Sequence, residues 1–420
     1  MAGEWRECAL GDVIELKRGY DLPQQNRRAG SVPLVSSSGV TDFHEEAAVK
    51  GPGVVTGRYG TLGQVFFIRD DFWPLNTTLY VRDFKANDPR FISYFLRGLD
   101  FLAYSDKAAV PGLNRNHLHQ ARVRIPSDTS EQRAIAHVLG TLDDKIELNR
   151  RMGETLEGIA RAIFKSWFVD FDPVRAKAKG RDPGLPNHLA DLFPDRLAAS
   201  ELGDIPDGWE VRRLGEMIET IKGCSYRSDE LVPSDTALVT LKSFARGGGY
   251  RPDGLKSFSG SYKPDQVVQP GELVIAGTDV TQAAEVIGRP AIVRGTNGYR
   301  TLVASLDTLI VRPRRSGMTR AFLYFLCGTE AFVAHTYAYT TGTTVLHLAK
   351  EAVPSYSFAW PLGGLVDQFD SLASSALDRI QALENESANL AALRDTLLPK
   401  LISGELRIKD VEPVAEEKVS

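Results

Sequence analysis

Hydrogen-bonding side chains gather in three short segments of the first lobe of the chain: Leu16–Asp21 (LKRGYD), Thr56–Gly63 (TGRYGTLG) and Gly112–His117 (GLNRNH). Arg, Lys, Asn and Thr side chains contact base edges and phosphates in nucleic-acid complexes, and glycine lets the backbone approach a phosphate closely. The three segments therefore predict contacts to nucleic acid. The candidate residues are Lys17, Arg18, Tyr20, Arg58, Tyr59, Thr61, Asn114, Arg115 and Asn116.

The second half of the chain has its own candidates, which include the basic, glycine-rich stretch Lys242–Arg251 (KSFARGGGYR). The candidates there are Lys222, Tyr226, Arg227, Lys242, Arg246, Arg251, Thr278, Gln282, Thr343 and Thr344. Ordinary surface structure is the alternative in both halves. Arg58 and Tyr59 also suit a soluble, packed hairpin, Asn114–Asn116 suits a polar turn, and Lys242–Arg251 suits a solvated loop.

Motifs for catalysis are missing from the sequence. The dipeptide Gly-Lys never occurs, so there is no Walker A loop. The segments FDPV and NDPR lack the second proline and the aromatic residue of an amino-methyltransferase motif. His117 and His119 have no Cys, Asp or Glu at ligand spacing beside them, which favours a loop over a metal site.

An internal repeat organises the chain. Six of fifteen positions are identical between Trp5–Gly19 and Trp209–Gly223. Asp88–Asp106 and Met318–Thr336 each predict one amphipathic helix. Each is followed by a predicted small polar loop, at Val110–Leu118 and at Thr340–Leu348. The sequence therefore predicts two related lobes.

Both lobes contain segments typical of strands. In the first lobe these are Pro52–Ile68, with two β-rich runs around a glycine-rich turn, and Thr77–Asp83. In the second lobe they are Glu272–Val280, Pro290–Gly295 and Thr308–Pro313. Each half of the chain is thus expected to begin with an α/β or β-rich lobe.

A long helix is predicted after each lobe, following Pro126 and Pro361, and Ser130 is the expected N-cap of the first. Apolar residues recur at alternating spacings of four and three, the pattern of a coiled-coil seam. The first seam is Leu142, Ile146, Asn149, Gly153, Leu156, Ala160, Ile163 and Trp167. The second is Leu372, Ala376, Ile380, Leu383, Ser387, Leu390, Arg394 and Leu397. Two stripes of similar length are expected to pack on each other in antiparallel fashion.

Composition limits the protein class. A chain of 420 residues predicts two or three domains, and the net charge of −4 argues weakly against indiscriminate nucleic-acid coating. No apolar run reaches the roughly 18 residues of a membrane span, and the N-terminus lacks the pattern of a signal peptide. The three separated cysteines suit a reducing cytoplasm.

Several blocks resemble those of one known family, the specificity subunits of Type I restriction-modification systems. The blocks are SEQRAIAHVLGTLDDKIELNRRM from residue 130, IFKSWFVDFDP from 163, ELGDIPDGW from 201, LRDTLLPKLISGEL from 393, and the lobe segment 36–67. The resemblance covers the chain in the family's order. It implies an α+β fold in which two α/β target recognition domains are separated by two long helices. These helices pair as an antiparallel coiled coil, with an approximate two-fold axis.

The resemblance also implies a function. Each target recognition domain would recognise one half of a bipartite, asymmetric DNA sequence. The helices would set the gap and dock two modification subunits, which hold S-adenosylmethionine and methylate adenine. A motor-nuclease subunit, where present, would add restriction. The chain itself would be non-catalytic, bind no cofactor or metal, and work in the cytoplasm.

The expected domain boundaries follow from these patterns. The first target recognition domain covers 1–127, its helical spacer 128–180, a linker 181–208, the second domain 209–356, the second spacer 362–406 and a flexible tail 407–420. Lys165, Trp167 and Phe168 are expected to end the first helix with an exposed aromatic pair. That pair could dock the modification subunit or cap the coiled coil.

Two other functions are compatible with parts of the sequence. A two-lobed coiled-coil scaffold would bind proteins and not DNA. An enzyme with a degenerate nuclease or methyltransferase motif would act alone on DNA. Salt-dependent DNA binding of the assembled complex argues against the scaffold, and inactivity of the isolated chain argues against the enzyme.

Overall fold

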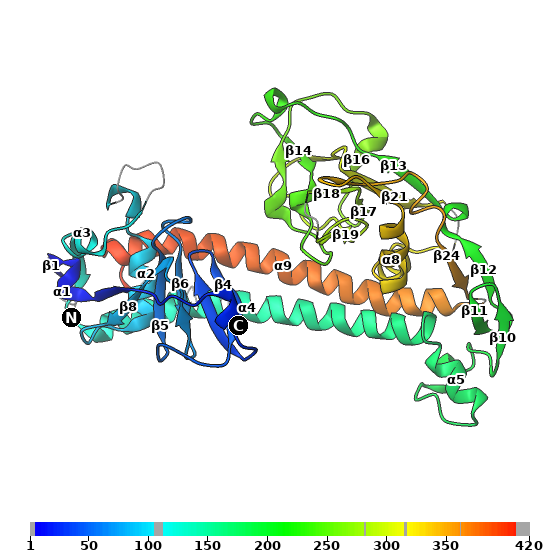
Figure 1. The fold of residues 1–420 in the computed structure, drawn as a ribbon, viewed down its shortest axis with the longest axis horizontal. Helices are drawn as coiled ribbons and strands as arrows, with labels where there is room; N and C mark the ends of the chain where they lie inside the picture. The colour runs from blue at the N-terminus through cyan, green and yellow to red at the C-terminus, as the bar shows by residue number, and fades with distance from the viewer. Residues whose placement is uncertain (1–4, 105–111, 281–282, 315–316, 362, 409–420) are drawn as a thin grey trace. The chain divides into compact units, whose positions relative to one another are not determined.

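The computed structural model describes residues 5–104, 112–280, 283–314, 317–361 and 363–408. The chain divides into two compact units: residues 1–150 with 386–420, and residues 151–385. Each unit contains one lobe and one half of each of two long helices, α4 (Thr129–Phe168) and α9 (Leu365–Ser403) (Figure 1).

The first unit is built around a four-stranded antiparallel sheet. A three-stranded sheet packs beside it, and a two-stranded ribbon joins the start of the lobe to its end. The central sheet has the order β2 (Glu15–Arg18), β8 (Thr78–Asp83), β5 (Gly53–Gly57), β6 (Val65–Ile68). The second has the order β4 (Gly39–His44), β3 (Val32–Ser36), β7 (Trp73–Pro74), and the ribbon pairs β1 (Trp5–Ala9) with β9 (Arg122–Pro126).

The second unit repeats this plan. Its lobe has two four-stranded sheets, a small three-stranded sheet and a ribbon. The central sheet has the order β13 (Ile218–Lys222), β21 (Thr308–Pro313), β17 (Leu273–Ala276), β19 (Pro290–Ile292). The other four-stranded sheet has the order β15 (Lys256–Ser257), β14 (Thr236–Val239), β20 (Thr301–Ala304), β16 (Val267–Val268). The ribbon pairs β12 (Glu210–Arg213) with β24 (Ser357–Trp360).

Both central sheets are buried on their two faces. In β5, Val54 belongs to the core shared with the helices, whereas Val55 faces the core under the three-stranded sheet. In β17, Leu273 and Val274 divide in the same way between two cores. Because successive side chains of a strand point to opposite faces, double burial explains why these segments are continuously apolar in sequence.

The repeated glycines Gly19 and Gly223 occupy equivalent positions. A Cβ atom at Gly19 would lie 2.2 Å from the carbonyl oxygen of Leu75, and one at Gly223 would lie 2.1 Å from that of Ser305. No side chain fits at such distances because the obstacle is backbone. The repeat therefore preserves glycine where the end of β2 or β13 crosses closely over a neighbouring segment.

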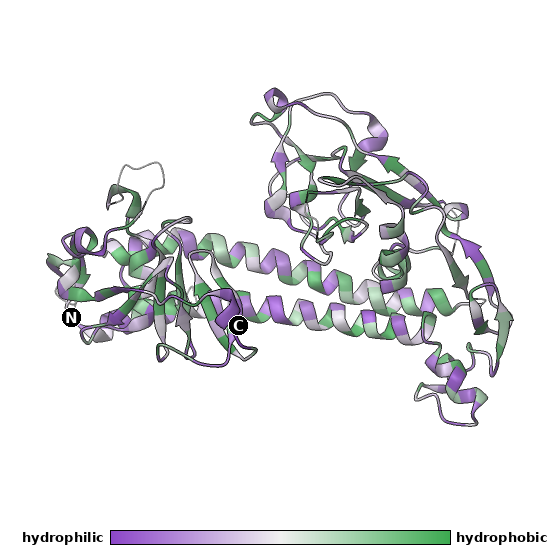
Figure 2. Ribbon diagram, in the orientation of Figure 1, coloured by the Kyte–Doolittle hydropathy of each residue, from purple (hydrophilic) through white to green (hydrophobic). Residues whose placement is uncertain are grey.

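The halves of α4 and α9 run antiparallel within each unit, as predicted. In the first unit Arg394 of α9 donates to Asp143 of α4 at 2.6 Å, and Asn149 donates to Glu386 at 2.9 Å. In the second unit Gly153 of α4 lies opposite Ile380 of α9, and a Cβ added at Gly153 would be in ordinary van der Waals contact, 3.7 Å from Ile380 Cγ2. The polar seam residues Asn149 and Arg394 are thus hydrogen-bonded and help to fix the register. Figure 2 shows hydrophobic and hydrophilic residues mixed along both helices.

One predicted seam position is wrong. Leu372 is 48% exposed, and the adjacent Ala373 is fully buried. The buried stripe of this part of α9 runs through Val366, Phe369 and Ala373. Val366, Phe369 and Ala373 follow one another at spacings of three and four residues. This pattern places Leu372 on the flank of the buried stripe.

The start of α4 also differs from the prediction. The helix begins at Thr129, and Asp128 rather than Ser130 satisfies its free N–H groups. The Ser130 N–H donates to the Asp128 carboxylate at 2.8 Å, and the Ser130 hydroxyl donates to the same carboxylate. These hydrogen bonds from Ser130 lower the pKa of Asp128. An acidic residue also suits the positive end of the helix dipole.

The segment interpreted as a linker is folded. After α4 the chain forms α5 (Asp172–Ala178), α6 (Asn187–Ala190) and a hairpin of β10 (Leu197–Ser200) with β11 (Gly203–Pro206). Phe193 and Ile205 are buried in the core of the second unit. The proline content of this segment suggested a flexible linker, but Phe193 and Ile205 pack it against the core.

Two further elements of the second lobe depart from expectation. Met318–Thr336 is not one helix: α7 (Arg320–Cys327) ends at Gly328, and Thr329 caps a new helix, α8 (Glu330–Ala338). Thr340–Leu348 is not a loop but a hairpin of β22 (Thr340–Thr341) and β23 (Leu346–Leu348) that pairs with β18 (Thr278–Asp279). No described helix combines the length and apolar character needed to cross a bilayer.

Candidate nucleic-acid interface

The three polar segments of the first lobe meet at one end of its central sheet. The Tyr20 N–H donates to the Pro74 carbonyl at 2.8 Å, and the Arg58 N–H donates to the Thr77 carbonyl at 2.8 Å. The Leu113 N–H then donates to the carbonyl of Arg58 at 3.0 Å. The backbone thus brings segments far apart in sequence together around the start of β8.

Asp21 organises the first part of this end. Its carboxylate accepts two hydrogen bonds from Arg18, at 3.1 and 3.2 Å, and one from the side-chain amide of Asn76. Tyr20 lies next to it, with its hydroxyl 3.0 Å from that of Tyr80. Asn76 was missed by the sequence analysis. The only signal was its position in a short polar run between two strands, which is common in loops.

Arg58 and Tyr59 form the second part. The Arg58 guanidinium lies over the Tyr59 ring at 4.6 Å, and Tyr59 is 42% exposed. The ring also covers Gly112, where a Cβ would come within 2.5 Å of it. Lys17 lies 5.2 Å from the centre of the Tyr20 ring in a similar pairing. A cation that is attracted to an aromatic ring is held in a defined position. From there it can bind a polyanion.

The third part is a short helix, α3 (Arg115–His119), and not the loop that the sequence predicted around His117. Asn114 accepts a hydrogen bond from the Asn116 N–H at 2.9 Å and thereby caps this helix, whereas Arg115 and Asn116 are exposed. His119 accepts from the Leu16 N–H at 2.9 Å, and burial lowers its pKa, so it is a neutral structural residue. Within the described part of the chain, no group of three or more His, Cys, Asp or Glu could hold a metal.

We name this surface the lobe-one edge. It consists of Lys17, Arg18, Tyr20, Arg58, Tyr59, Asn76, Arg115 and Asn116. Thr61 is exposed in the turn that follows Tyr59. The structure therefore brings together all three predicted segments of the first lobe and adds Asn76. Arginine and asparagine side chains at one edge, with few acids beside them, can bind phosphates and the edges of guanine and adenine.

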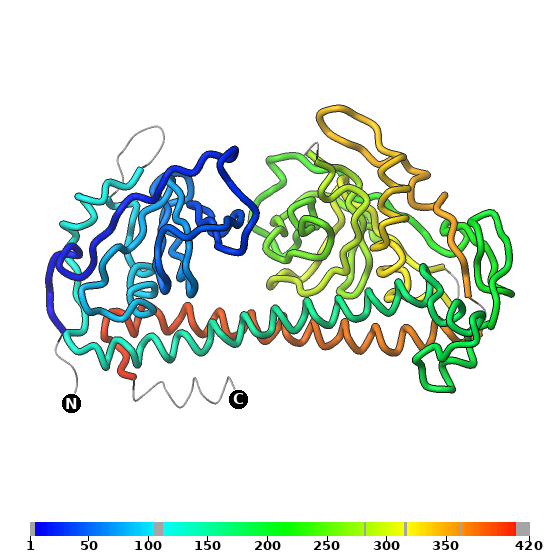
Figure 3. Tube along the Cα trace, turned by 60° about the horizontal axis from the view of Figure 1, so that its bottom comes forward, coloured from blue at the N-terminus to red at the C-terminus, as the bar shows by residue number. Residues whose placement is uncertain are grey.

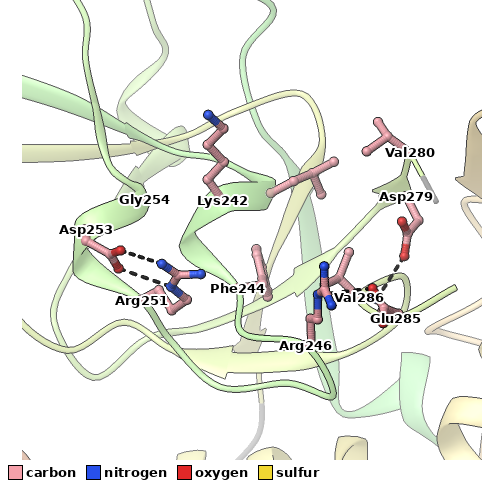
Figure 4. A pocket seen from close by; sticks show the side chains of 11 residues that line it. Lys242, Phe244, Arg246, Arg251, Asp253, Gly254, Asp279, Val280, Glu285 and Val286 are labelled. Carbon is pink, nitrogen blue, oxygen red and sulfur yellow. Dashed lines mark hydrogen bonds and ion pairs between the residues drawn. The ribbon is translucent and has the colours of Figure 1, made fainter. Parts of the chain in front are cut away.

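A pocket of about 410 Å³ gathers the basic candidates of the second lobe (Figure 4). Lys242, Arg246 and Arg251 line it. Arg251 is held by Asp253, with contacts of 2.5 and 3.2 Å, and Arg246 is 3.2 Å from Glu285. Both arginines have half or more of their side chains exposed, so each pair is weak and can exchange its acid for a phosphate.

Two other candidates nearby are structural. Thr278 is 6% exposed and donates to Asp307 at 3.0 Å. Its neighbour Asp279 is 1% exposed and accepts from the N–H groups of Val286 and Ile287 at 2.8 and 3.3 Å. This carboxylate shapes the wall of the pocket. Gln282 lies outside the described residues.

The remaining second-lobe candidates lie on other elements of the lobe. Thr343 and Thr344 are exposed in the turn of the β22–β23 hairpin, which pairs with the strand that carries Thr278. Lys222 is exposed at the end of β13, and Arg227 is 3.7 Å from Asp229. Tyr226 is half-buried, and burial raises its pKa.

The expectation of an exposed aromatic pair at the end of α4 is wrong. Trp167 is 4% exposed and Phe168 is 7% exposed. Trp167 packs against Phe193 of the segment predicted to be a linker, with ring centres 5.4 Å apart. Phe168 packs against Phe322 of α7 at 5.0 Å. Only Lys165 stays on the surface, paired with Asp170, so this group anchors the lobe instead of presenting a docking patch.

Comparison with known proteins identifies the family. Residues 2–158 match the family model described as Type I restriction modification DNA specificity domain. The chain is 24% identical to the Type I restriction enzyme HindI specificity subunit of Haemophilus influenzae, over 96% of this chain and all of that protein. The predicted resemblance to the specificity subunits of Type I systems is thus confirmed by these matches.

Other relatives agree with this assignment. The MjaIX specificity subunit of Methanocaldococcus jannaschii is also 24% identical, over 86% of this chain and 79% of that protein. The crystal structure of a Type I system S subunit from M. genitalium shares the fold, with a TM-score of 0.56 and 13% identity over 95% of this chain and 96% of that one. The predicted resemblance and the predicted α+β fold are therefore supported by both the sequence relatives and a solved structure.

Proposed function

We propose that each lobe recognises a different half of a bipartite, asymmetric DNA target. The observation that carries this proposal is the repeat itself. The two lobes share their central sheet, ribbon and close-crossing glycines. Their candidate contacts differ: the lobe-one edge presents Arg18, Arg58 and Asn76, whereas the second lobe presents Lys242 and Arg246 beside a pocket. A shared framework with different hydrogen-bonding groups suits two different half-sites.

The long helices are proposed to set the gap between the half-sites. The helix α4 has 40 residues and α9 has 39. At about 1.5 Å per residue, each spans about 60 Å, which is longer than the roughly 34–36 Å between half-sites one DNA turn apart. The lobes are proposed to be residues 1–127 and 209–356, and the spacers residues 128–180 and 362–406.

An apolar groove on the helix pair supports docking of modification subunits. In the second unit a groove of about 310 Å³ is lined by Leu156, Ile159, Ile163, Leu372 and Ala376, among others. Ile159 is 53% exposed and Leu372 is 48% exposed. Glu157 faces the lobe, and Ile159 lies two positions further along α4. Two positions correspond to about 200° around a helix, so Ile159 points away from the lobe. Figure 3 shows the chain of the second lobe along one side of the helix segments of its unit.

Such a groove suits an amphipathic helix of a partner protein. We propose that it receives a helix of the modification subunit, and that two such subunits bind one chain. S-adenosylmethionine would then be held by the modification subunit, which transfers the methyl group to adenine. A motor-nuclease subunit would join the same complex for restriction. This chain would provide target choice and assembly.

Replacing Ile159 by glutamate should weaken assembly with the modification subunit about tenfold or more, because a charge would be buried in an apolar contact. Analytical ultracentrifugation of the mixed subunits measures this. Val40→Glu is the matched control, since Val40 is an exposed apolar residue (48%) on β4 of the first unit. Equal loss of assembly in both variants would contradict the docking site.

The proposed function is tested by mapping modified bases in host DNA with and without the gene. A split motif that carries one methyladenine on each strand, and that disappears on deletion of the gene, is the expected result. An unchanged map from a host that expresses the modification subunit would overturn the proposal. It would favour a protein-binding scaffold instead.

A further inference from the structure

A buried polar cluster joins the second lobe to both long helices. We name it the lobe-two clamp: Glu157 of α4, Glu384 of α9, Tyr324 of α7 and Arg294, which follows β19. The Tyr324 hydroxyl donates to Glu157 at 2.6 Å. Arg294 reaches both acids, with nitrogen–oxygen distances of 3.1 Å to Glu384 and 3.5 Å to Glu157. One arginine of the lobe thus bridges the two helices.

The clamp is shielded from water at its centre, whereas the Glu384 side chain at its rim is 47% exposed. The Arg294 side chain is 7% exposed and the Glu157 side chain is 21% exposed. Burial alone would raise the pKa of Glu157, but the Tyr324 hydrogen bond and the positive charges of Arg294 and Arg161 outweigh it, so the pKa is lowered. Burial raises the pKa of Glu384 despite its contact with Arg294. Arg294 is thus the partner shared by both acids and lies closer to Glu384, whereas Glu157 also accepts the hydrogen bond from the Tyr324 hydroxyl.

Apolar packing and this clamp contribute differently to the lobe's position. Phe322 and Phe325 of the lobe pack against Phe164 and Phe369 of the helices. The hydrophobic part of this attachment is proportional to the apolar area buried and is non-directional. Hydrogen bonds weaken steeply when distance or angle departs from the optimum. A buried charged network is costly to displace, because any shift leaves a charge unpaired.

We propose that the lobe-two clamp is a positioning device that fixes where the second half-site is held relative to the helices, and so makes the protein selective for one gap length. This inference rests on the proposed function. A gap longer or shorter by one base pair moves a half-site by about 3.4 Å and rotates it by roughly one tenth of a turn. Hydrogen bonds of the clamp's length break under a displacement of that size.

The first unit has a comparable arrangement. Tyr94 of α2 (Pro89–Arg97), the repeat counterpart of Tyr324, donates to Asp143 of α4 at 2.6 Å. Arg97 lies 3.2 Å from the same carboxylate, and Arg394 of α9 lies 2.6 Å from it. Burial would raise the pKa of Asp143, but the hydrogen bonds from Tyr94 and Arg394 lower it. Both lobes are therefore tied to helix carboxylates by a tyrosine and arginines, which argues that the contact serves a shared purpose.

The test measures methylation by the assembled complex on duplexes that carry both half-sites at gaps from two base pairs short to two base pairs long. Tyr324→Phe removes one hydroxyl and should leave the fold intact. Glu157→Gln removes the central charge. Tyr337→Phe is the matched control, because Tyr337 is 52% exposed on α8. Thermal unfolding of each complex establishes that it is folded.

The wild type should prefer its own gap to the neighbouring gaps by about 100-fold, the cost of misplacing a few base contacts. Tyr324→Phe should reduce this preference about tenfold, which corresponds to the coupling energy of such networks. Its preference for the bases of each half-site should not change, and neither should the gap preference of Tyr337→Phe.

An unchanged gap preference in folded Tyr324→Phe would overturn the positioning role, and so would equal loss of activity at every gap. If Glu157→Gln fails to assemble, Tyr324→Phe alone decides. If the wild type methylates no duplex with split half-sites, the proposed function itself has failed.

Discussion

A chain in which both Arg18 and Arg58 are replaced by alanine is expected to lose recognition of one half-site and to retain the other. Both residues lie on the lobe-one edge, on either side of Asn76. Each arginine that contacts a guanine edge contributes about 1–3 kcal/mol, so binding should weaken about 30-fold or more. Competition binding of the assembled complex, with the first or the second half-site scrambled, measures the effect.

The control for this prediction uses two arginines at the opposite end of the same sheet. Arg69 follows β6 and pairs with Asp144, and Arg82 lies near the end of β8 and pairs with Glu15. The pairing of Gly53 with Ile68 places Arg69 away from the turn that carries Arg58. The Arg69→Ala, Arg82→Ala chain removes the same charge and should keep its half-site preference. If both double variants lose the same discrimination, only net charge matters and the edge is not the recognition surface.

Phe322→Ala should destabilise the second unit by about 3–5 kcal/mol, the usual cost of deleting a large buried aromatic side chain. Phe322 is fully buried on α7, with its ring 5.1 Å from that of Phe164 and 5.0 Å from that of Phe168. The substitution opens a cavity where the lobe meets the helices. For a unit of this size the melting temperature should fall by about 6–20 °C, measured by calorimetry.

Phe43→Ala is the control for this substitution, since Phe43 is 52% exposed on β4. It should change the stability by less than about 0.5 kcal/mol. A small effect of Phe322→Ala would mean that the aromatic cluster can collapse around the cavity. The apolar contact would then contribute less than the clamp to holding the lobe.

The sequence predicted the repeated framework because repetition is visible without any knowledge of contacts. Gly19 and Gly223 stood out at a fixed offset, and the structure shows that the backbone at Leu75 and Ser305 excludes any side chain there. The strands around Val54 and Val274 were also predictable. They are buried on both faces, so their apolar runs are continuous.

The failures have a common physical cause, which is that a helix has more than one face. Trp167 and Leu372 both belong to apolar helix segments, yet Trp167 is buried and Leu372 is exposed. Which flank is covered depends on Phe193 and Phe322, contributed by distant parts of the chain. Asn76, which lies in a turn, also depends on a distant residue and so could not be predicted. Its importance comes from Asp21, 55 positions away in sequence.

The two-stranded ribbons that close the two lobes have a consequence for the exchange of gene segments. Trp5 pairs with Pro126 at the two ends of the first lobe, and Glu210 pairs with Trp360 at the two ends of the second. A chain segment that starts and finishes at neighbouring points can be exchanged without pulling on what remains. Recombination between related genes within these boundaries would replace one lobe in a single event, while both helices and the groove on them stay as they were.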